Sequence, residues 1–140
     1  MARILAIDYG QKRTGLAVTD PLQLIANGME TVNSAELLVF LKDYFTRENV
    51  EMVVIGYPKQ LNNTASAAVK FVNEFIKKFK KNFPERNFVL FDERFTSKMA
   101  FQTMIDGGLT KKKRRDKSLV DKISATILLQ SYLEYKNTNT

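Results

Sequence analysis

The sequence has 140 residues and a formal net charge of +7, from 22 Lys and Arg against 15 Asp and Glu. Its hydrophobic content of 44% and charged content of 26% are typical of a globular protein. We expect a single domain over residues 1–140, because domains most often have about 100–150 residues. The sequence contains no Cys and no His. Disulfides, thiolate or imidazole metal ligands, cysteine nucleophiles and the Ser-His-Asp triad are therefore excluded, and any catalysis must use carboxylates, amines, guanidinium groups or hydroxyls.

The positive charge is concentrated in two segments. The run 111–117 holds six cations and one anion, and four lysines lie close together between residues 77 and 81. Concentrated positive charge favours a polyanionic partner, nucleic acid before an acidic membrane surface. No apolar run approaches the roughly 20 residues of a membrane span, and the apolar run 4–7 is too short for the core of a signal peptide. We therefore expect a cytoplasmic protein.

Apolar patterning predicts strands that alternate with helices along most of the chain. Short apolar runs between turn residues predict strands at 4–7, 15–18, 24–32, 52–55 and 88–91. Helical spacing predicts helices that begin at Ser34 as N-cap, near Ala65, at Thr96 and at Ser118, the third ending at Gly107-Gly108 and the last near Tyr135. The aromatic residues Phe71, Phe75 and Phe79, spaced by four, are expected in the core rather than on a base-stacking platform.

This order of elements predicts an α/β fold around a mixed five-stranded sheet. The first three strands follow one another through short turns and are expected to be antiparallel. The last two are reached through helical crossovers and are expected to run parallel to the first strand, with helices on both faces of the sheet. In such sheets, ligands bind at the carboxyl ends of the parallel strands.

Three carboxylates are predicted to meet at that edge. Asp8 ends the first strand, Glu93 follows the last one, and Asp121 lies in the first turn of the last helix. Clustered carboxylates repel one another unless a cation neutralises them, and hard divalent cations prefer oxygen ligands. The pattern therefore indicates a site for Mg²⁺ or Mn²⁺. The bound metal, one ion or two, could polarise a phosphoryl oxygen and activate water.

Each of these residues also has a structural interpretation. Asp8 precedes a Gly by two positions and could simply form a turn. Asp92 and Glu93 could be loop charges paired with Arg94, and the pattern alone does not choose between the two acids. Asp121 could complete a capping box with Ser118 or pair with Lys117, four positions earlier.

Basic residues beside these carboxylates are candidates for binding substrate phosphates. Lys12 and Arg13 lie in the first turn and could either contact a phosphate or remain solvated. The basic run directly precedes the helix of Asp121, which favours its role as a substrate clamp. The candidate substrate-binding residues are Lys12, Arg13, Arg94, Lys111, Lys112, Lys113, Arg114, Arg115 and Lys117.

Four motifs in the same order resemble those of the YqgF family, which has an RNase H-like fold related to that of RuvC-type Holliday-junction resolvases. The opening motif spans residues 8–20 (DYGQKRTGLAVTD), and the others are 56–58 (GYP), 92–97 (DERFTS) and 120–125 (VDKISA). The resemblance covers essentially the whole chain. It implies a metal-binding active site formed by Asp8, Glu93 and Asp121, and it selects Glu93 over Asp92.

This chain departs from the family pattern in its loops. Tyr57 stands where Leu is usual, Asn63 where a Gly is usual, and Ser97 where Thr is commoner. None of the three is a candidate metal ligand, so these departures concern the shape of the loops.

The resemblance favours a metal-dependent nuclease that processes the 5′ end of pre-16S rRNA, with ribosomal particles as further partners. Cleavage of a four-way DNA junction is the alternative in the same class. A non-catalytic nucleic-acid-binding module is the alternative in another class. A phosphotransferase of the actin and sugar-kinase type is disfavoured, because such enzymes hold ATP between two domains and this length supplies one.

Overall fold

The computed structural model, which describes residues 2–58, 67–92 and 117–138, contains a mixed five-stranded sheet in the order β3-β2-β1-β4-β5. The strands are β1 (Arg3–Asp8), β2 (Arg13–Thr19), β3 (Ala26–Asn33), β4 (Val50–Tyr57) and β5 (Phe88–Asp92). β1 pairs antiparallel with β2 and parallel with β4, β2 pairs antiparallel with β3, and β4 pairs parallel with β5. This topology confirms the predicted sheet.

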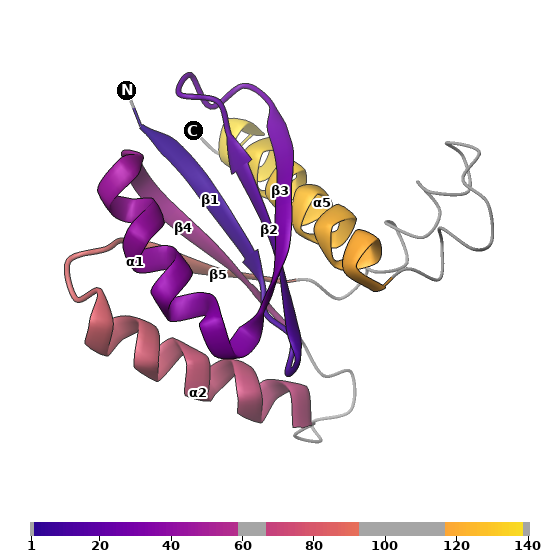
Figure 1. Ribbon diagram of the computed structural model, residues 1–140. Coiled ribbons are helices and arrows are strands. Elements are labelled where there is room, and N and C mark those ends of the chain that lie inside the picture. Colours follow the sequence, from indigo (N-terminus) through magenta and orange to yellow (C-terminus); the bar gives the residue numbers. More distant parts are fainter. Residues whose placement is uncertain (1, 59–66, 93–116, 139–140) are drawn as a thin grey trace.

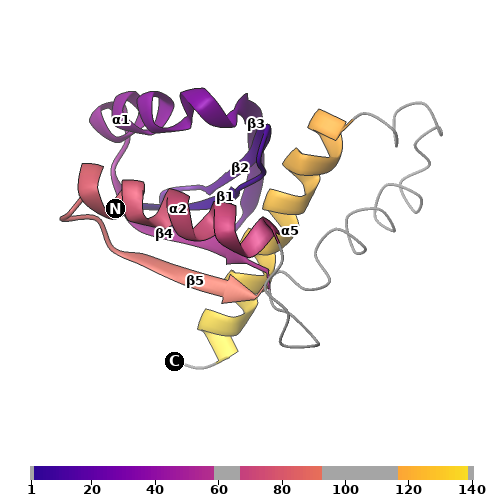
Figure 2. The ribbon, with the colours of Figure 1, turned by 90° about the horizontal axis from the view of Figure 1, so that it is seen from below.

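Helices cover both faces of the sheet, as predicted (Figure 1). The short 3₁₀ helix η1 (Ser34–Glu36) leads into α1 (Leu37–Arg47), and α2 (Ala67–Asn82) lies beside α1 on the same face. The long helix α5 (Lys117–Thr138) crosses the opposite face (Figure 2). The helix predicted from Thr96 to Gly107 lies outside the described residues. No helix in the described ranges is long and apolar enough to cross a membrane.

Strand alternation divides the core into two layers. In β1, Leu5 and Ile7 face α1 and α2, while Ile4 and Ala6 face α5, and all four are at most 1% exposed. Each large apolar side chain buried in this way contributes about 1.5–3 kcal/mol relative to its exposed state. Phe75 and Phe79 are buried in the first layer, which confirms their predicted place in the core, whereas Phe71 is only half-buried.

Two predicted helix starts are corrected by the structure. Asn33 is the N-cap residue of η1 and Glu36 that of α1, and neither makes a side-chain capping bond. Ser34 therefore does not cap the helix; its hydroxyl is bonded to the turn between β1 and β2 instead. Ser118 lies inside the first turn of α5, which already includes Lys117, so it is not an N-cap either.

Glycines let the beginning of α5 lie directly on the sheet. A Cβ atom added to Gly15 would lie 2.0 Å from the backbone carbonyl oxygen of Asp121, so only glycine permits this approach. A Cβ added to Gly28 would lie 2.8 Å from Cε of Lys122 and 2.9 Å from Oγ1 of Thr126, which are side-chain atoms. The Thr31 hydroxyl adds a hydrogen bond to the Ser118 carbonyl. The first turn of α5 is thus fixed over β2 and β3.

The loop between β2 and β3 is held by a single carboxylate. Asp20 accepts hydrogen bonds from the backbone N–H groups of Leu22, Leu24 and Ile25 at 2.8–3.0 Å. These bonds lower the pKa of Asp20, because they stabilise its charged form. Gln23, in the left-handed region at φ 60°, donates to the Ala2 carbonyl and accepts from Lys136 of α5.

We expect Gly15→Ala to destabilise the protein by about 1–3 kcal/mol, because the new methyl group would force the backbone of α5 away from β2. Gly28→Ala is the matched control. Its methyl group would meet side-chain atoms that can turn aside, so its cost should be under about 1 kcal/mol. Urea denaturation of both variants measures the difference. Equal destabilisation would contradict the backbone contact at Gly15.

We also expect Asp20→Ala to lower the urea midpoint at neutral pH. The folded-state pKa of Asp20 is depressed, so its contribution is complete above the ordinary Asp pKa of about 3.9 and is lost as the pH falls through the lower folded value. The difference between the two proteins should therefore disappear in acid, well below about pH 4. Asp43→Ala, which removes an exposed ion pair with Arg47, serves as the control. A difference that persisted unchanged in acid would exclude the carboxylate bonds as its cause.

Candidate functional site

Asp8 lies at the carboxyl end of β1 and on the α5 face of the sheet. Side chains alternate along a strand, so Asp8 shares its face with Ile4 and Ala6, both of which pack under α5. Its register partner on β2 is Gly15, whose own partner on β3 is Thr31. Asp8, Gly15 and Thr31 therefore form one row across three strands.

The first turn of α5 follows this row toward Asp8. The Ser118 carbonyl bonds to Thr31 at one end of the row, and the Asp121 carbonyl lies against Gly15 in the middle. Asp8 is next in the row, since directly paired residues on antiparallel strands have Cα atoms about 4.5–5.5 Å apart. Asp8 and the backbone of Asp121, which are far apart in the sequence, thus both adjoin Gly15.

Alternation also bears on the choice between Asp92 and Glu93. In β5, Val89 and Phe91 pack with the α5 layer, whereas Phe88 packs with the α1 and α2 layer. Asp92 has the parity of Phe88, so it projects to the face away from Asp8. Glu93 is the next residue in the chain and lies outside the described residues. Within the described ranges, no three acidic side chains gather into a group that could hold a metal ion.

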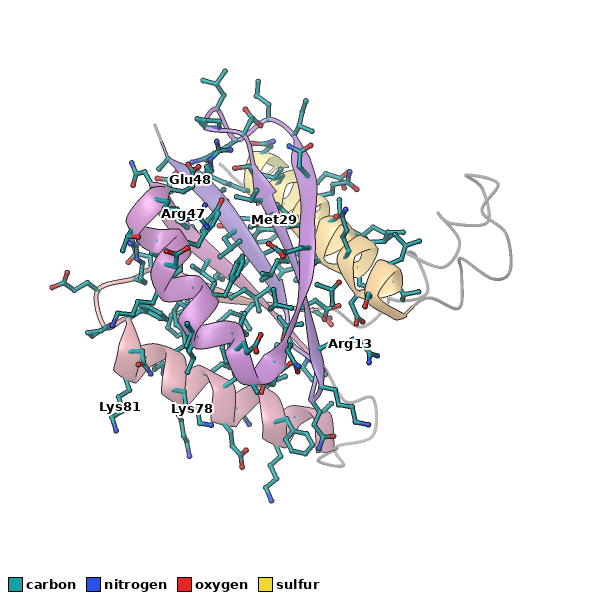
Figure 3. All side chains as sticks on the ribbon, viewed as in Figure 1. Arg13, Met29, Arg47, Glu48, Lys78 and Lys81 are labelled. Carbon is teal, nitrogen blue, oxygen red and sulfur yellow. The ribbon has the colours of Figure 1, made fainter. Side chains whose placement is uncertain are left out.

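An ion pair joins the beginning of β2 to α5. The Arg13 guanidinium donates from Nε to Oδ2 of Asp121 at 3.2 Å, with the two side chains 37% and 29% exposed. Figure 3 shows Arg13 on the side of the sheet where α5 begins, and Arg47 at the far end of α1. Arg13 has the same parity as Gly15, which explains how it reaches the α5 face. The sequence did not indicate this contact, because the two residues are 108 positions apart.

Ser34 fixes the β1–β2 turn, which carries Lys12 and leads into Arg13, the first residue of β2. Its hydroxyl donates to the Gly10 carbonyl and its backbone N–H donates to the Lys12 carbonyl. The Thr14 hydroxyl, fully buried, lies 2.8 Å from the Ser34 hydroxyl and must donate to it, since the single Ser34 proton is already used. Sequence reasoning missed this role, although a Ser directly after a strand was its one signal.

Tyr9 anchors the same turn on the opposite face. Its ring stacks on Phe75 of α2 with centroids 4.6 Å apart and planes 10° from parallel. Burial, with a smaller effect from Glu74, raises the pKa of the Tyr9 phenol, so this group stays protonated at neutral pH. The β1–β2 turn is therefore fixed by α2 on one face and by Ser34 at its base.

The structure brings together only some of the predicted site residues. Asp8, Arg13 and Asp121 lie around Gly15, and Lys12 is exposed in the adjoining turn. The backbone of Lys117 begins α5. The other predictions lie outside the described residues: Glu93, Arg94, Lys111, Lys112, Lys113, Arg114 and Arg115. Carboxylate oxygens at the carboxyl ends of parallel strands are suitable donors for a hard divalent cation.

Curated relatives match this chain over almost its full length. It is 60% identical over 136 residues to a Flavobacterium psychrophilum protein named "Putative pre-16S rRNA nuclease", a match that covers 97% of this chain and 99% of that protein. It is 61% identical over 133 residues to a protein of the same name from Christiangramia forsetii, covering 95% and 98% respectively.

A solved structure of T. thermophilus RuvC in complex with a Holliday junction substrate has a TM-score of 0.65 with this chain, at 16% sequence identity, and the match covers 99% of this chain and 97% of that one. This likeness confirms the predicted RuvC-like, RNase H-like fold. The family model described as "RuvX: Holliday junction resolvase" matches residues 2–135. The chain therefore belongs to the RuvX family, for which YqgF is the other name.

Proposed function

We propose that this protein is a metal-dependent nuclease whose active site is formed by Asp8, Glu93 and Asp121. The observation that carries the proposal is that Asp8 and the backbone of Asp121 both adjoin Gly15, at the carboxyl end of β1. The projection of Asp92 to the other face supports Glu93 as the third carboxylate. The motif resemblance favours the same three residues.

The donor set suits Mg²⁺ or Mn²⁺. Carboxylates are hard oxygen ligands, and the chain has no His or Cys that would favour softer metals. Asp8, Glu93 and Asp121 would hold one ion or a pair. When bound, the metal would polarise a phosphoryl oxygen and activate water for attack on phosphorus.

The protein's own residues would bind and orient the nucleic acid. Arg13 lies at the proposed site, Lys12 is exposed beside it, and the turn that carries Lys12 and leads into Arg13 is fixed by Ser34. A fixed turn reduces the entropy lost when the phosphates are bound. Further phosphate contacts are proposed for Arg94 and for the basic run Lys111, Lys112, Lys113, Arg114, Arg115 and Lys117, which directly precedes the helix of Asp121 in the sequence.

We propose pre-16S rRNA as the substrate, in a ribosomal particle in the cytoplasm. The names of relatives that are 60% and 61% identical support this choice. A four-way DNA junction is the second candidate, favoured by the family's description and by the junction bound to T. thermophilus RuvC. Cleavage of RNA and of DNA would use the same metal chemistry, and the substrates differ in shape and in the 2′-OH group.

A cleavage assay tests the proposal. A precursor 16S rRNA leader and a four-way DNA junction are incubated with wild type and with Asp8→Asn, in Mg²⁺, in Mn²⁺ and in EDTA. We expect metal-dependent cleavage of the RNA, and a decrease of at least about 100-fold in the variant, since even indirect metal contacts are worth about 10–100-fold. Binding of the RNA, measured by fluorescence anisotropy, should be retained, because the substitution removes a negative charge.

Asp92→Asn is the matched control, because it makes the same chemical change on the opposite face of β5 and should leave cleavage unchanged. Retained cleavage in pure Asp8→Asn protein would reject the proposed site. Cleavage of the junction alone would replace rRNA by DNA as the substrate. Binding of RNA in EDTA with no cleavage of either substrate in any metal would instead indicate a binding module.

The basic run should determine the salt dependence of RNA binding. Replacing Lys111, Lys112, Lys113, Arg114 and Arg115 by Gln should reduce the slope of log K against log salt by about 0.7–0.9 for each phosphate that is no longer neutralised, because fewer counterions are released. The control replaces the four exposed lysines Lys77, Lys78, Lys80 and Lys81 of α2, of which Lys78 and Lys81 are seen in Figure 3 to project away from the sheet. An equal decrease in both variants would reject a local clamp.

A further inference from the structure

The ion pair between Arg13 and Asp121 places a fixed positive charge on one of the proposed metal ligands. A guanidinium group and a divalent cation would both neutralise the same carboxylate, and they repel each other. The inference drawn from this competition deepens the proposed function and rests on it. A metal ion would therefore bind Asp121 less tightly while Arg13 stays paired with it.

The ion pair is built so that it can open. It joins Nε to Oδ2 at 3.2 Å, between side chains that are 37% and 29% exposed. Ion pairs with this much exposure typically contribute only about 0–1 kcal/mol, because water solvates both charges. Arg13 is the first residue of β2, at the end of the strand next to the turn with Lys12. Its long side chain can therefore leave Asp121 without a change in the sheet.

A substrate phosphate offers Arg13 a better partner than Asp121 does. The guanidinium group can form two parallel hydrogen bonds with a phosphate, whereas it meets Asp121 through Nε. The phosphate that is cleaved must approach the carboxylates of the proposed site. It therefore enters the region around Gly15 that Arg13 already reaches.

We propose that Arg13 is a positioning residue that exchanges Asp121 for a substrate phosphate. Without nucleic acid, Arg13 neutralises Asp121 and weakens metal binding. With nucleic acid, Arg13 moves to the phosphate and Asp121 becomes available to the metal. Metal and nucleic acid then bind cooperatively, and the coupling is reciprocal: each strengthens the binding of the other by the same factor.

The alternative is that Arg13 only tethers α5 to the sheet. The tether would be redundant, because the contact of Gly15 with the α5 backbone and the bond from Thr31 to Ser118 already fix the first turn. The two roles also differ in what they predict. Loss of a tether lowers stability and leaves metal affinity unchanged or weaker, whereas loss of a competing charge makes metal binding tighter.

Manganese binding without substrate tests the exchange. The concentration of free Mn²⁺ is followed by its EPR signal during titration of wild type, Arg13→Gln, Arg13→Lys and Arg47→Gln. Arg47 also pairs with an Asp through Nε, at 3.0 Å, but its partner Asp43 lies on α1 far from the site. We expect Arg13→Gln to bind Mn²⁺ at least about five-fold more tightly than wild type, the lower end of typical coupling. The Mn²⁺ affinity of Arg13→Lys should lie between those of wild type and Arg13→Gln, and the Mn²⁺ affinity of Arg47→Gln should equal that of wild type.

The reciprocal effect is measured on RNA binding. The affinity for a short labelled RNA is determined by anisotropy with and without Mn²⁺, and the RNA is checked on a gel to be intact. Wild type should bind RNA at least about five-fold more tightly with Mn²⁺, and this enhancement should be smaller in Arg13→Gln, where only the direct contact of the metal with the phosphate remains. Equal Mn²⁺ affinity in wild type and Arg13→Gln would overturn the exchange, as would a full enhancement in the variant.

Two controls separate this inference from the proposed function and from misfolding. If Asp8→Asn and Asp121→Asn bind Mn²⁺ as wild type does, the proposed metal site itself is wrong. If those variants lose Mn²⁺ while Arg13→Gln binds it like wild type, the site stands and the exchange is rejected. A lowered melting temperature of Arg13→Gln with unchanged Mn²⁺ affinity would assign Arg13 to the tether.

Discussion

The direct contact between the backbone of α5 and Gly15 is the constraint on which the rest of the site depends. A helix that lies on a sheet through side chains is held about one side-chain layer away from it, but at Gly15 that layer is missing. The first turn of α5 can therefore reach the row of Asp8, Gly15 and Thr31. This contact brings the backbone of Asp121 to the row that contains Asp8, and it also brings the Asp121 side chain within reach of Arg13.

Burial explains why the polar residues of the site lie at the end of the sheet. The central strand β1 is covered on both faces, so its residues from Ile4 to Ile7 are apolar and almost fully buried. An ionised side chain in that interval would lose its hydration without a partner, which is costly. At Asp8 the covering layers end, so a charged side chain at this position can be hydrated or can bind a ligand. The same strand therefore contributes to the core through Ile4 to Ile7 and to the proposed site through Asp8.

The sequence predicted the sheet because its signals are local. Four apolar residues before Asp8, and again before Gly56, identify buried parallel strands, and the spacing of Phe75 and Phe79 identifies the inner face of α2. The sequence could not predict contacts between distant segments. The pair of Arg13 with Asp121, the bonds of Ser34 to the β1–β2 turn and the approach of α5 to Gly15 depend on how elements dock. Local signals alone therefore predicted Ser34 as an N-cap, because that prediction uses only the residues next to Ser34 in the sequence.

The distance along the chain between Asp8 and Asp121 has a consequence for the time at which activity can begin. Translation produces β1 well before α5, so a nascent chain that has reached only β5 carries Asp8 without Asp121. Such a chain also leaves Ile4, Ala6 and Val54 uncovered, because their buried environment is supplied by α5. Under the proposed function, a growing polypeptide has no complete site until α5 has left the translating ribosome. Under that function, a ribosome must translate the whole stretch from β1 through α5 before the new chain can cut RNA.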